Sequence, residues 1–323
     1  MKFVLSPRGR KYFVIVTKIL VTAAILIFIA KLVESDEILV TLSGIDIPMV
    51  ILGVLAMWLN VALSALRWQV FLGFFRVRAS LLDCMRIYAE AVTLNLILPG
   101  SVGGDVFRIY KLGRERGKGR YWEILSSVLA DRFCSLLILI ALCAGTLTLH
   151  GNLVGVQLTI IWGLVVMLAL GFVFVYAFPI SRHWMRNWAY RLLSRLVYIV
   201  RRLFRGPRRI GLALFLSISV QIPILMSMYF SILSVSIELA DVNIVILSTT
   251  LATLAAMIPV TLAGFGMREG AIVVVLTLFG ATPERAAAIA AVFAVCTLGQ
   301  CLPGLLSWLS FRSKAFFFSK APT

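Results

Sequence analysis

Charged residues are scarce in this chain of 323 residues, and acidic ones are the scarcest. Only 14% of the residues are charged, with 14 Asp and Glu against 31 Lys and Arg, whereas 61% are hydrophobic. Soluble globular domains carry about a quarter charged residues. This composition, with a mean hydropathy of +1.01, excludes an ordinary soluble domain and predicts an all-α polytopic membrane protein.

Residue types that build metal and nucleophile sites are also few. The chain has two histidines and five scattered cysteines, without metal-ligand spacing between them. No Walker-type loop and no nucleic-acid-binding motif accompanies the net charge of +17. We therefore predict no metal site, no cofactor and no nucleic-acid partner, and we interpret the clustered cations as cytoplasmic loops.

The positions of the charges predict the topology. Four cations precede the first apolar run, which is too long for a signal peptide, and the loop after it holds only acids. By the positive-inside rule the N-terminus is cytoplasmic, as are the C-terminal tail and the loop 179–209 with its nine arginines and no acid. The second span is expected to emerge into the cytoplasm at Arg67, Arg76 and Arg78. The expected full-length spans are 13–33, 47–66, 124–149, 153–178, 210–236 and 286–309.

Two further apolar stretches, 81–112 and 242–280, are each interrupted in the middle by glycine and proline. The flanking charges do not alternate across either stretch, so each stretch enters and leaves on one side. Two ordinary crossings per stretch would satisfy the same rule. The short legs, with breakers at the turn, favour re-entrant helical hairpins, the first from the cytoplasm and the second from outside.

The two interrupted stretches contain similar motifs, "PGSVGGDVFR" at 99–108 and "PVTLAGFGMR" at 259–268. The initial proline, a glycine and the final arginine align at an offset of 160 residues. Three predicted spans separate the motifs, so the two have opposite orientation. This predicts an inverted internal repeat within one transmembrane domain, with halves at 1–165 and 166–323, as in secondary transporters.

Each motif places glycines before a predicted helix start and an arginine about one turn into the helix. Free N–H groups at a helix N-terminus favour an anion, and arginine suits bidentate phosphate contact. We therefore predict a cradle for a phosphate-bearing head group on each hairpin. The predicted binding residues are Asn95, Gly103, Gly104, Asp105, Arg108, Gly264, Gly266, Arg268 and Glu269, joined by Glu90, Asp131 and Arg132, with Pro99, Pro259 and Pro303 as structural breakers.

The acids are expected to orient the arginines. Asp105 lies three residues before Arg108 and so on the same helical face, whereas Glu269 follows Arg268 directly and is expected to point elsewhere. Asp131 lies about two turns inside a span, where ionisable groups are costly. Purely structural roles are the alternative: the Asp105–Arg108 pair would only hold the hairpin, and Asp131 with its neighbour Arg132 would only anchor a helix.

Arginines at i, i+4 recur beside tryptophan and leucine in the segment 182–209. This pattern predicts a cytoplasmic amphipathic helix on anionic lipid, which serves topology and anchoring.

Three stretches, "NLILPGSVGGDVFRIYKL", "ADRF" and "GFGMREGAIVVVLTLFG", together resemble the flippase-like membrane-domain family named after the lysylphosphatidylglycerol synthase transmembrane region. The resemblance covers nearly the whole chain and implies transport of a lipid between leaflets, as in multiple peptide resistance factors, which move aminoacylated phosphatidylglycerol. Other members are linked to glycolipid, hopanoid or polyprenyl-lipid pathways. No synthetase domain accompanies the membrane domain here, so lysylphosphatidylglycerol is not the expected cargo.

We therefore expect a flippase of the cell (inner) membrane, not an enzyme, that moves an anionic phosphate-bearing lipid. Because the sequence contains no ATP-binding Walker motif, the energy for transport would come from ions, the membrane potential or the lipid gradient. Its partners would be membrane lipids and a lipid-biosynthesis enzyme. Two alternatives are a membrane-embedded lipid-linked glycosyl or phosphoryl transferase and a non-catalytic scaffold for a lipid-synthesis partner.

Overall fold

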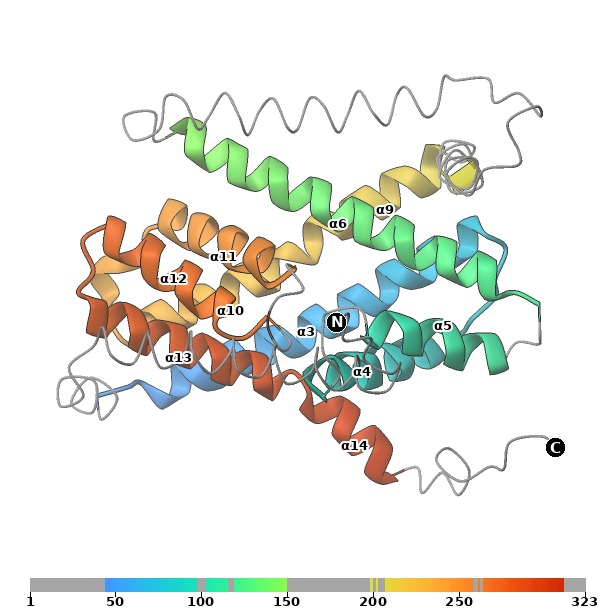
Figure 1. Ribbon diagram of the computed structural model, residues 1–323, viewed down its shortest axis with the longest axis horizontal. Helices are drawn as coiled ribbons and strands as arrows, with labels where there is room; N and C mark the ends of the chain where they lie inside the picture. The colour runs from blue at the N-terminus through green and yellow to red at the C-terminus, as the bar shows by residue number, and fades with distance from the viewer. Residues whose placement is uncertain are drawn as a thin grey trace, which may run out of the picture.

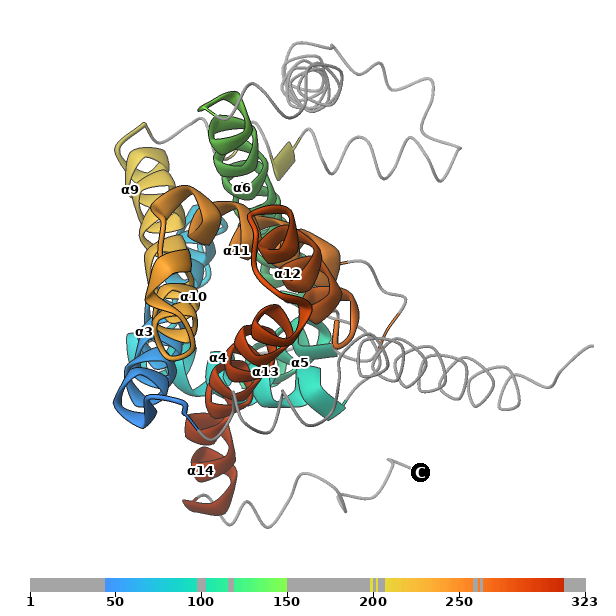
Figure 2. The same ribbon diagram turned by 90° about the vertical axis from the view of Figure 1, so that its left-hand side faces the viewer.

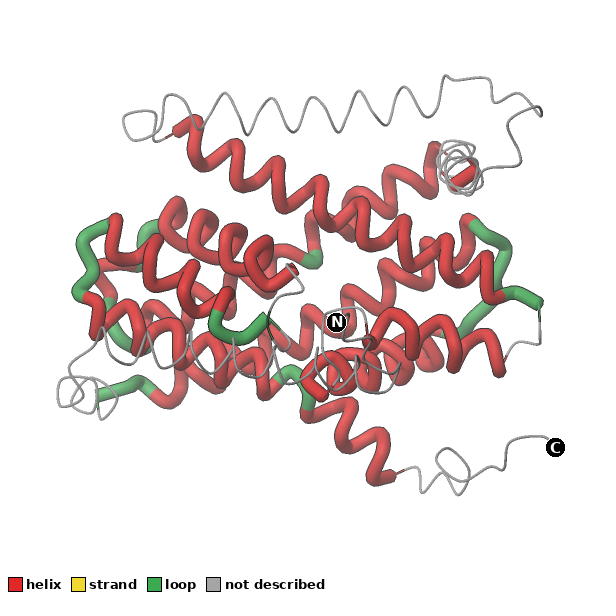
Figure 3. Tube along the Cα trace, viewed as in Figure 1, coloured by secondary structure: helices red, strands yellow, loops and turns green. Residues whose placement is uncertain are grey.

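Every regular element in the described part of the chain is a helix (Figure 3). The structure, a computed structural model, describes residues 44–97, 103–115, 119–149, 198–199, 202, 207–257, 261 and 264–310. The predicted spans 13–33 and 153–178, most of the segment 182–209, Pro99, Pro259 and both termini lie outside these residues.

Four helices of the first half are described, and two of them are long. The long helices are α3 (Ile47–Phe74) and α6 (Tyr121–Leu149), and between them lie the short helices α4 (Leu81–Ile97) and α5 (Gly103–Glu115). The elements described from residue 207 on are α9 (Pro207–Ser219), α10 (Gln221–Leu233), the 3-10 turn η2 (Ile237–Leu239), α11 (Val242–Met257), α12 (Met267–Leu278), α13 (Pro283–Gly299) and α14 (Leu302–Ser310).

Four helical segments are long and apolar enough to cross a membrane: Ile47–Phe74, Tyr121–Thr146, Arg208–Leu233 and Pro283–Trp308. They coincide with four of the six expected spans, so the prediction of an all-helical membrane protein is confirmed for the described residues. α3 extends beyond the expected end of the second span at residue 66 and ends at Phe74, before Arg76 and Arg78. Instead of stopping before Arg67, α3 continues for two more turns, because the residues after that arginine are again mostly apolar.

The helix pair α4–α5 and the helix pair α11–α12 lie at opposite ends of the molecule (Figure 1). α4 and α5 pack together beside the end of α3 and the start of α6, whereas α11 and α12 pack together beside α10 and α13. Seen from one end, α3 and α10 lie side by side, and α12 lies on the opposite side of the bundle (Figure 2). α3 therefore connects the two halves.

The apolar core has two parts, and α3 contributes to both. One part joins Met57 of α3 to α10, α12 and α13, and the other joins Trp68 and Phe71 of α3 to α4, α5, α6 and α9. Small residues bring helices into contact, as membrane helices require. A side chain on Gly53 would meet the Cys296 sulfur of α13 at 2.7 Å, and one on Gly299 would meet Val54 at 2.9 Å.

Two long spans are interrupted, and Asn60 of α3 contacts both interruptions. Asn60 Nδ2 donates to the carbonyl of Val220, between α9 and α10, at 2.9 Å, and Asn60 Oδ1 accepts from Gln300 Nε2, between α13 and α14, at 3.1 Å. Pro303 has no N–H for the carbonyl of Gly299, four residues earlier. Trp58 Nε1 donates to that carbonyl instead, at 2.9 Å.

Replacing Asn60 by Leu is expected to lower the free energy of unfolding by about 1 kcal/mol, since one buried side chain supplies two interhelical hydrogen bonds. Unfolding in mixed detergent micelles measures this. The matched control is Asn243→Leu, because the Asn243 side chain makes no hydrogen bond among the described residues. Equal stability of the two variants would contradict the bridging role.

Candidate ionic site of the first hairpin

The two legs of the first helix pair meet through Asn95 and Gly104. The Gly104 N–H, at the start of α5, donates to Asn95 Oδ1 near the end of α4 at 2.7 Å. A Cβ at Gly104 would overlap the carbonyl oxygen of Ala91 and approach Asn95 Oδ1 at 2.8 Å. Glycine thus permits a backbone approach that fixes α5 against α4.

Five charged side chains from α3, α5 and α6 form what we call the Arg108 cluster: Arg67, Asp105, Arg108, Asp131 and Arg132. Arg108 Nη2 donates to Asp105 Oδ1, which confirms that the two residues share a helical face. Arg108 Nη1 reaches Asp131 Oδ2 at 3.5 Å, and Arg67 Nε lies 2.7 Å from Asp131 Oδ1. Arg132 Nε donates to Asp105 Oδ2 at 2.8 Å.

The members of the Arg108 cluster differ in access. Arg108 is 2% exposed, and its guanidinium lies over the rings of Trp68, at 5.1 Å, and Tyr88, at 4.7 Å. The Arg132 side chain is 37% exposed. Arg108 is therefore held by carboxylates and rings, whereas Arg132 is the arginine of the cluster that a ligand can reach directly.

Arg67 is a cluster member that the sequence prediction missed. The charge pattern placed it at a cytoplasmic helix end, but the residue is 3% exposed inside α3. Its Nη1 atom is buried without a hydrogen-bond partner among the described residues. The sequence did contain a signal for this position. The residues after Arg67 are again mostly apolar, which indicates that the arginine lies inside a span and not at its end. Three arginines and two aspartates give the cluster a formal charge of +1.

Glu90 forms a separate ionic group that joins α4, α5 and α14. It is buried and accepts from Lys111 Nζ, from Arg86 Nε at 3.2 Å and from Ser307 Oγ at 2.9 Å. Near it, Gly304 packs so closely on α4 that a Cβ there would overlap the carbonyl of Ala89. These contacts hold α14 against α4 and α4 against α5.

The second hairpin carries a smaller ionic group around Arg268 and Glu269. The expectation that Glu269 points away was wrong: its Oε1 accepts from Arg268 Nε at 3.0 Å and Nη2 at 2.6 Å. Its Oε2 accepts from the Gly266 N–H at 2.6 Å. Glu269 is the third residue of α12, so its carboxylate turns back to cap the helix start, where Arg268 can reach it.

Glycine conformation shapes the turn before α12. Gly264 has φ +81° and Gly266 has φ +86°, in the region that residues with a Cβ rarely adopt. The turn places Arg268 against Phe265, 4.8 Å from the ring centroid, and Phe293, at 5.7 Å. Arg108 and Arg268 are thus both buried, paired with an acid and stacked on aromatic rings.

The predicted site residues therefore fall into separate groups. Asn95, Gly103, Gly104, Asp105, Arg108, Asp131 and Arg132 lie together or adjacent in the first half. Gly264, Gly266, Arg268 and Glu269 lie together on the second hairpin, Glu90 belongs to its own ionic group, and Pro303 lies near the start of α14.

The helices, the spans and the buried ionic groups define a polytopic α-helical membrane protein with charges inside its bundle. Residues 15–304 match the family model described as "Lysylphosphatidylglycerol synthase TM region". The chain belongs to this family, and the resemblance in its motifs is confirmed. A search of curated proteins found no match.

Proposed function

We propose that this protein moves an anionic, phosphate-bearing lipid between leaflets and that the head group binds at the Arg108 cluster. The family indicates a lipid-related membrane function. The observation that carries the proposal is the surplus cation of the cluster, with Arg132 partly exposed and Arg67 Nη1 unpartnered. Within these five side chains, one positive charge is not balanced by a carboxylate. Positive charge inside a membrane bundle is costly, and a phosphate would neutralise it. No catalytic step is needed in this role.

An inverted repeat is part of the proposal, and the helix bounds support it. Shifting the starts of α3, α4, α5 and α6 by 160 residues gives 207, 241, 263 and 281, within four residues of the observed starts of α9, α11, α12 and α13. α3 and the α9–α10 pair run in opposite directions (Figure 1). Asn60 and Val220 are equivalent positions under this shift, and they hydrogen-bond to each other, as residues beside a two-fold axis would.

Re-entrant hairpins are also part of the proposal, and the described lengths of α4, α5, α11 and α12 support them. The structure describes 17 and 13 residues of α4 and α5, and 16 and 12 residues of α11 and α12. At 1.5 Å per residue these legs span about 18 to 26 Å, less than the hydrocarbon core of about 30 Å. Each pair would therefore turn back inside the membrane, in the arrangement that transporters use around a central site.

The proposed orientation is supported by the charges at the two ends of the bundle. Arg76, Arg78, Arg120 and Arg209 gather at what we call the cationic end. The opposite ends of the spans carry Asp46, Glu238, Asp241 and Glu284. We place the cationic end in the cytoplasm of a cell-membrane protein, together with both chain termini.

Transport in proteoliposomes tests the proposal with Arg132→Gln. A fluorescent phosphatidylglycerol reports head-group accessibility in each leaflet. Loss of the reachable guanidinium is expected to lower the transbilayer rate at least about tenfold, in line with a lost charge-assisted contact of 1.4 kcal/mol or more. Asp105 keeps Arg108 as its partner in this variant, so the fold is expected to persist.

The matched control is Arg114→Gln, which removes an exposed arginine that makes no ion pair among the described residues. It is expected to transport at the wild-type rate. Equal rates for Arg132→Gln and an active wild type would contradict head-group binding at the Arg108 cluster.

A further inference from the structure

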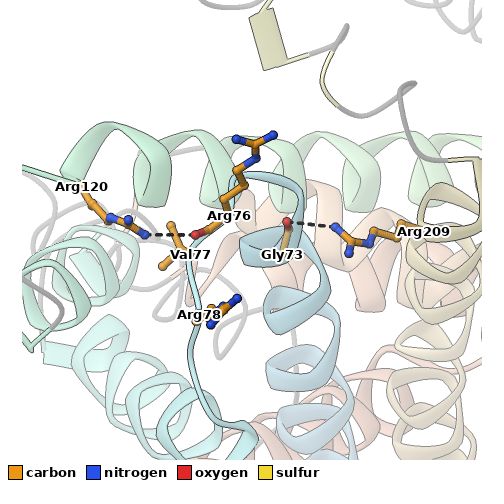
Figure 4. Close-up of a pocket in the computed structure, with 6 residues that line it drawn as sticks. All are labelled: Gly73, Arg76, Val77, Arg78, Arg120 and Arg209. Atoms are coloured by element: carbon orange, nitrogen blue, oxygen red, sulfur yellow. Dashed lines mark hydrogen bonds between the residues drawn. The ribbon is translucent and has the colours of Figure 1, made fainter.

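A pocket of about 770 Å³ opens at the cationic end of α3 (Figure 4). Among the described residues, its lining contains four arginines and no acid: Gly73, Arg76, Val77, Arg78, Arg120 and Arg209. It lies apart from the Arg108 cluster, because Gly73 follows Arg67 by six residues, or about 9 Å along the helix. Four cations around one cavity focus a positive potential into it.

Two of these arginines are positioned by the carbonyl groups around the end of α3. Arg209 Nη1 donates to the carbonyl of Gly73 at 3.3 Å, and Arg120 Nη1 donates to the carbonyl of Arg76 at 3.1 Å (Figure 4). Each guanidinium has five N–H donors, so further donors are left for a ligand. These two side chains therefore combine helix capping with placement at the pocket.

The other two arginines are not explained by capping. Arg76 and Arg78 are exposed and make no side-chain hydrogen bond or ion pair among the described residues. The positive-inside rule accounts for cations at this end of the bundle. It does not account for a single cavity whose described lining places two arginines without a side-chain partner beside two capping arginines and includes no carboxylate.

The backbone of Arg76 adds an independent observation. Its φ is +59°, and it is the only residue other than glycine with positive φ in the described part of the chain. The Val77 N–H donates to the carbonyl of Leu72 at 3.0 Å and the Arg76 N–H to that of Gly73 at 3.2 Å, which is the helix-ending motif that normally carries glycine at this position. Arginine there costs about 1–2 kcal/mol relative to glycine, so the backbone alone would favour glycine at this position.

We propose that this pocket binds the phosphate group of an anionic lipid at the cytoplasmic surface. Arginine guanidinium groups match the geometry of phosphate oxygens. The site is separate from the head-group site of the proposed transport function, and binding here requires no transport. An inorganic phosphate ion has the same chemistry, so the test includes it as a second source.

Arg76→Gly tests the proposal, because it removes the guanidinium and also relieves the backbone. The full chain in detergent, with and without Arg132→Gln to weaken binding at the Arg108 cluster, is titrated with short-chain phosphatidylglycerol, with short-chain phosphatidylcholine and with inorganic phosphate. Wild type is expected to bind phosphatidylglycerol at least about tenfold more tightly than phosphatidylcholine. The variant is expected to lose at least about fivefold of that affinity, with an unchanged or higher melting temperature.

Arg208→Ala is the matched control, since it removes one charge from an exposed residue of α9 that does not line the pocket. It is expected to keep the wild-type affinity. Equal losses in Arg76→Gly and Arg208→Ala, or no loss in Arg76→Gly, would overturn the proposal. If wild type binds inorganic phosphate and Arg76→Gly does not, the pocket is a phosphate site and a soluble phosphate ion is its ligand. Loss of transport in Arg132→Gln tests head-group binding at the Arg108 cluster and says nothing about this pocket.

Discussion

Replacing Asp131 by Asn is expected to lower the free energy of unfolding by about 3–5 kcal/mol, since it removes one partner of a buried charge pair. Asp131 is 1% exposed and lies 2.7 Å from Arg67 and 3.5 Å from Arg108. Arg108 would keep Asp105, but Arg67 would have no acid beside it among the described residues. Chemical unfolding in mixed micelles measures the change.

The control for this substitution is Asp46→Asn. Asp46 is exposed before α3, makes no side-chain capping bond and forms no ion pair among the described residues. It is expected to change stability by less than about 0.5 kcal/mol. If the Asp131 and Asp46 variants were equally stable, the ionic contacts inside the bundle would not hold the helices together.

The double variant Arg67→Met/Asp131→Asn separates structure from ligand binding. Replacing both partners removes the stranded charge, so the double variant is expected to recover much of the lost stability. If transport recovers as well, the pair only holds α3 to α6. If stability recovers without transport, the result assigns a ligand contact to Arg67, whose Nη1 is unpartnered in the structure.

Local features of the Arg108 cluster could be predicted from sequence, and its long-range contacts could not. The spacing of Asp105 and Arg108 on one helix fixes their shared face, and the structure pairs them. The contact between Arg108 and Asp131 joins α5 to α6. It depends on how the two helices are rotated against each other, which hydropathy and charge patterns do not specify.

Two errors show what such patterns leave out. Arg67 was expected at the cytoplasmic end of the second span because the charge rule ends a span at its first cations, but a buried carboxylate from another helix can hold an arginine inside the bundle. Glu269 was expected to point away because adjacent residues do not share a helical face. That rule applies inside a helix, and a residue in the first turn bends back to the free N–H groups.

The hairpin turn shows how small residues and charges act together. Gly104 lies one residue before Asp105. The close contact between α5 and α4 therefore also fixes the position of the Asp105 carboxylate, which pairs with Arg108 and Arg132. The contact is made by backbone atoms of Ala91, which cannot rotate out of the way. The position of the Arg108 cluster therefore depends on a residue that carries no charge.

Gly104→Ala is accordingly expected to lower stability by about 1–3 kcal/mol, as overpacking does, and to abolish most transport. The new methyl group would overlap the Ala91 carbonyl oxygen and weaken the bond from Gly104 N–H to Asn95. α5 would have to move away from α4 and carry Asp105 with it. Unfolding in mixed micelles and transport in proteoliposomes measure the two effects.

The matched controls are Gly145→Ala in α6 and Gly211→Ala in α9, where an added Cβ meets nothing within 4 Å. Alanine is the better helix former by about 1 kcal/mol, so both variants are expected to be as stable as wild type or more so. A Gly104 variant that behaved like these two would show that α5 is free to shift on α4. A Gly104 variant with normal stability but little transport would instead locate its effect in the positions of Asp105 and Arg108.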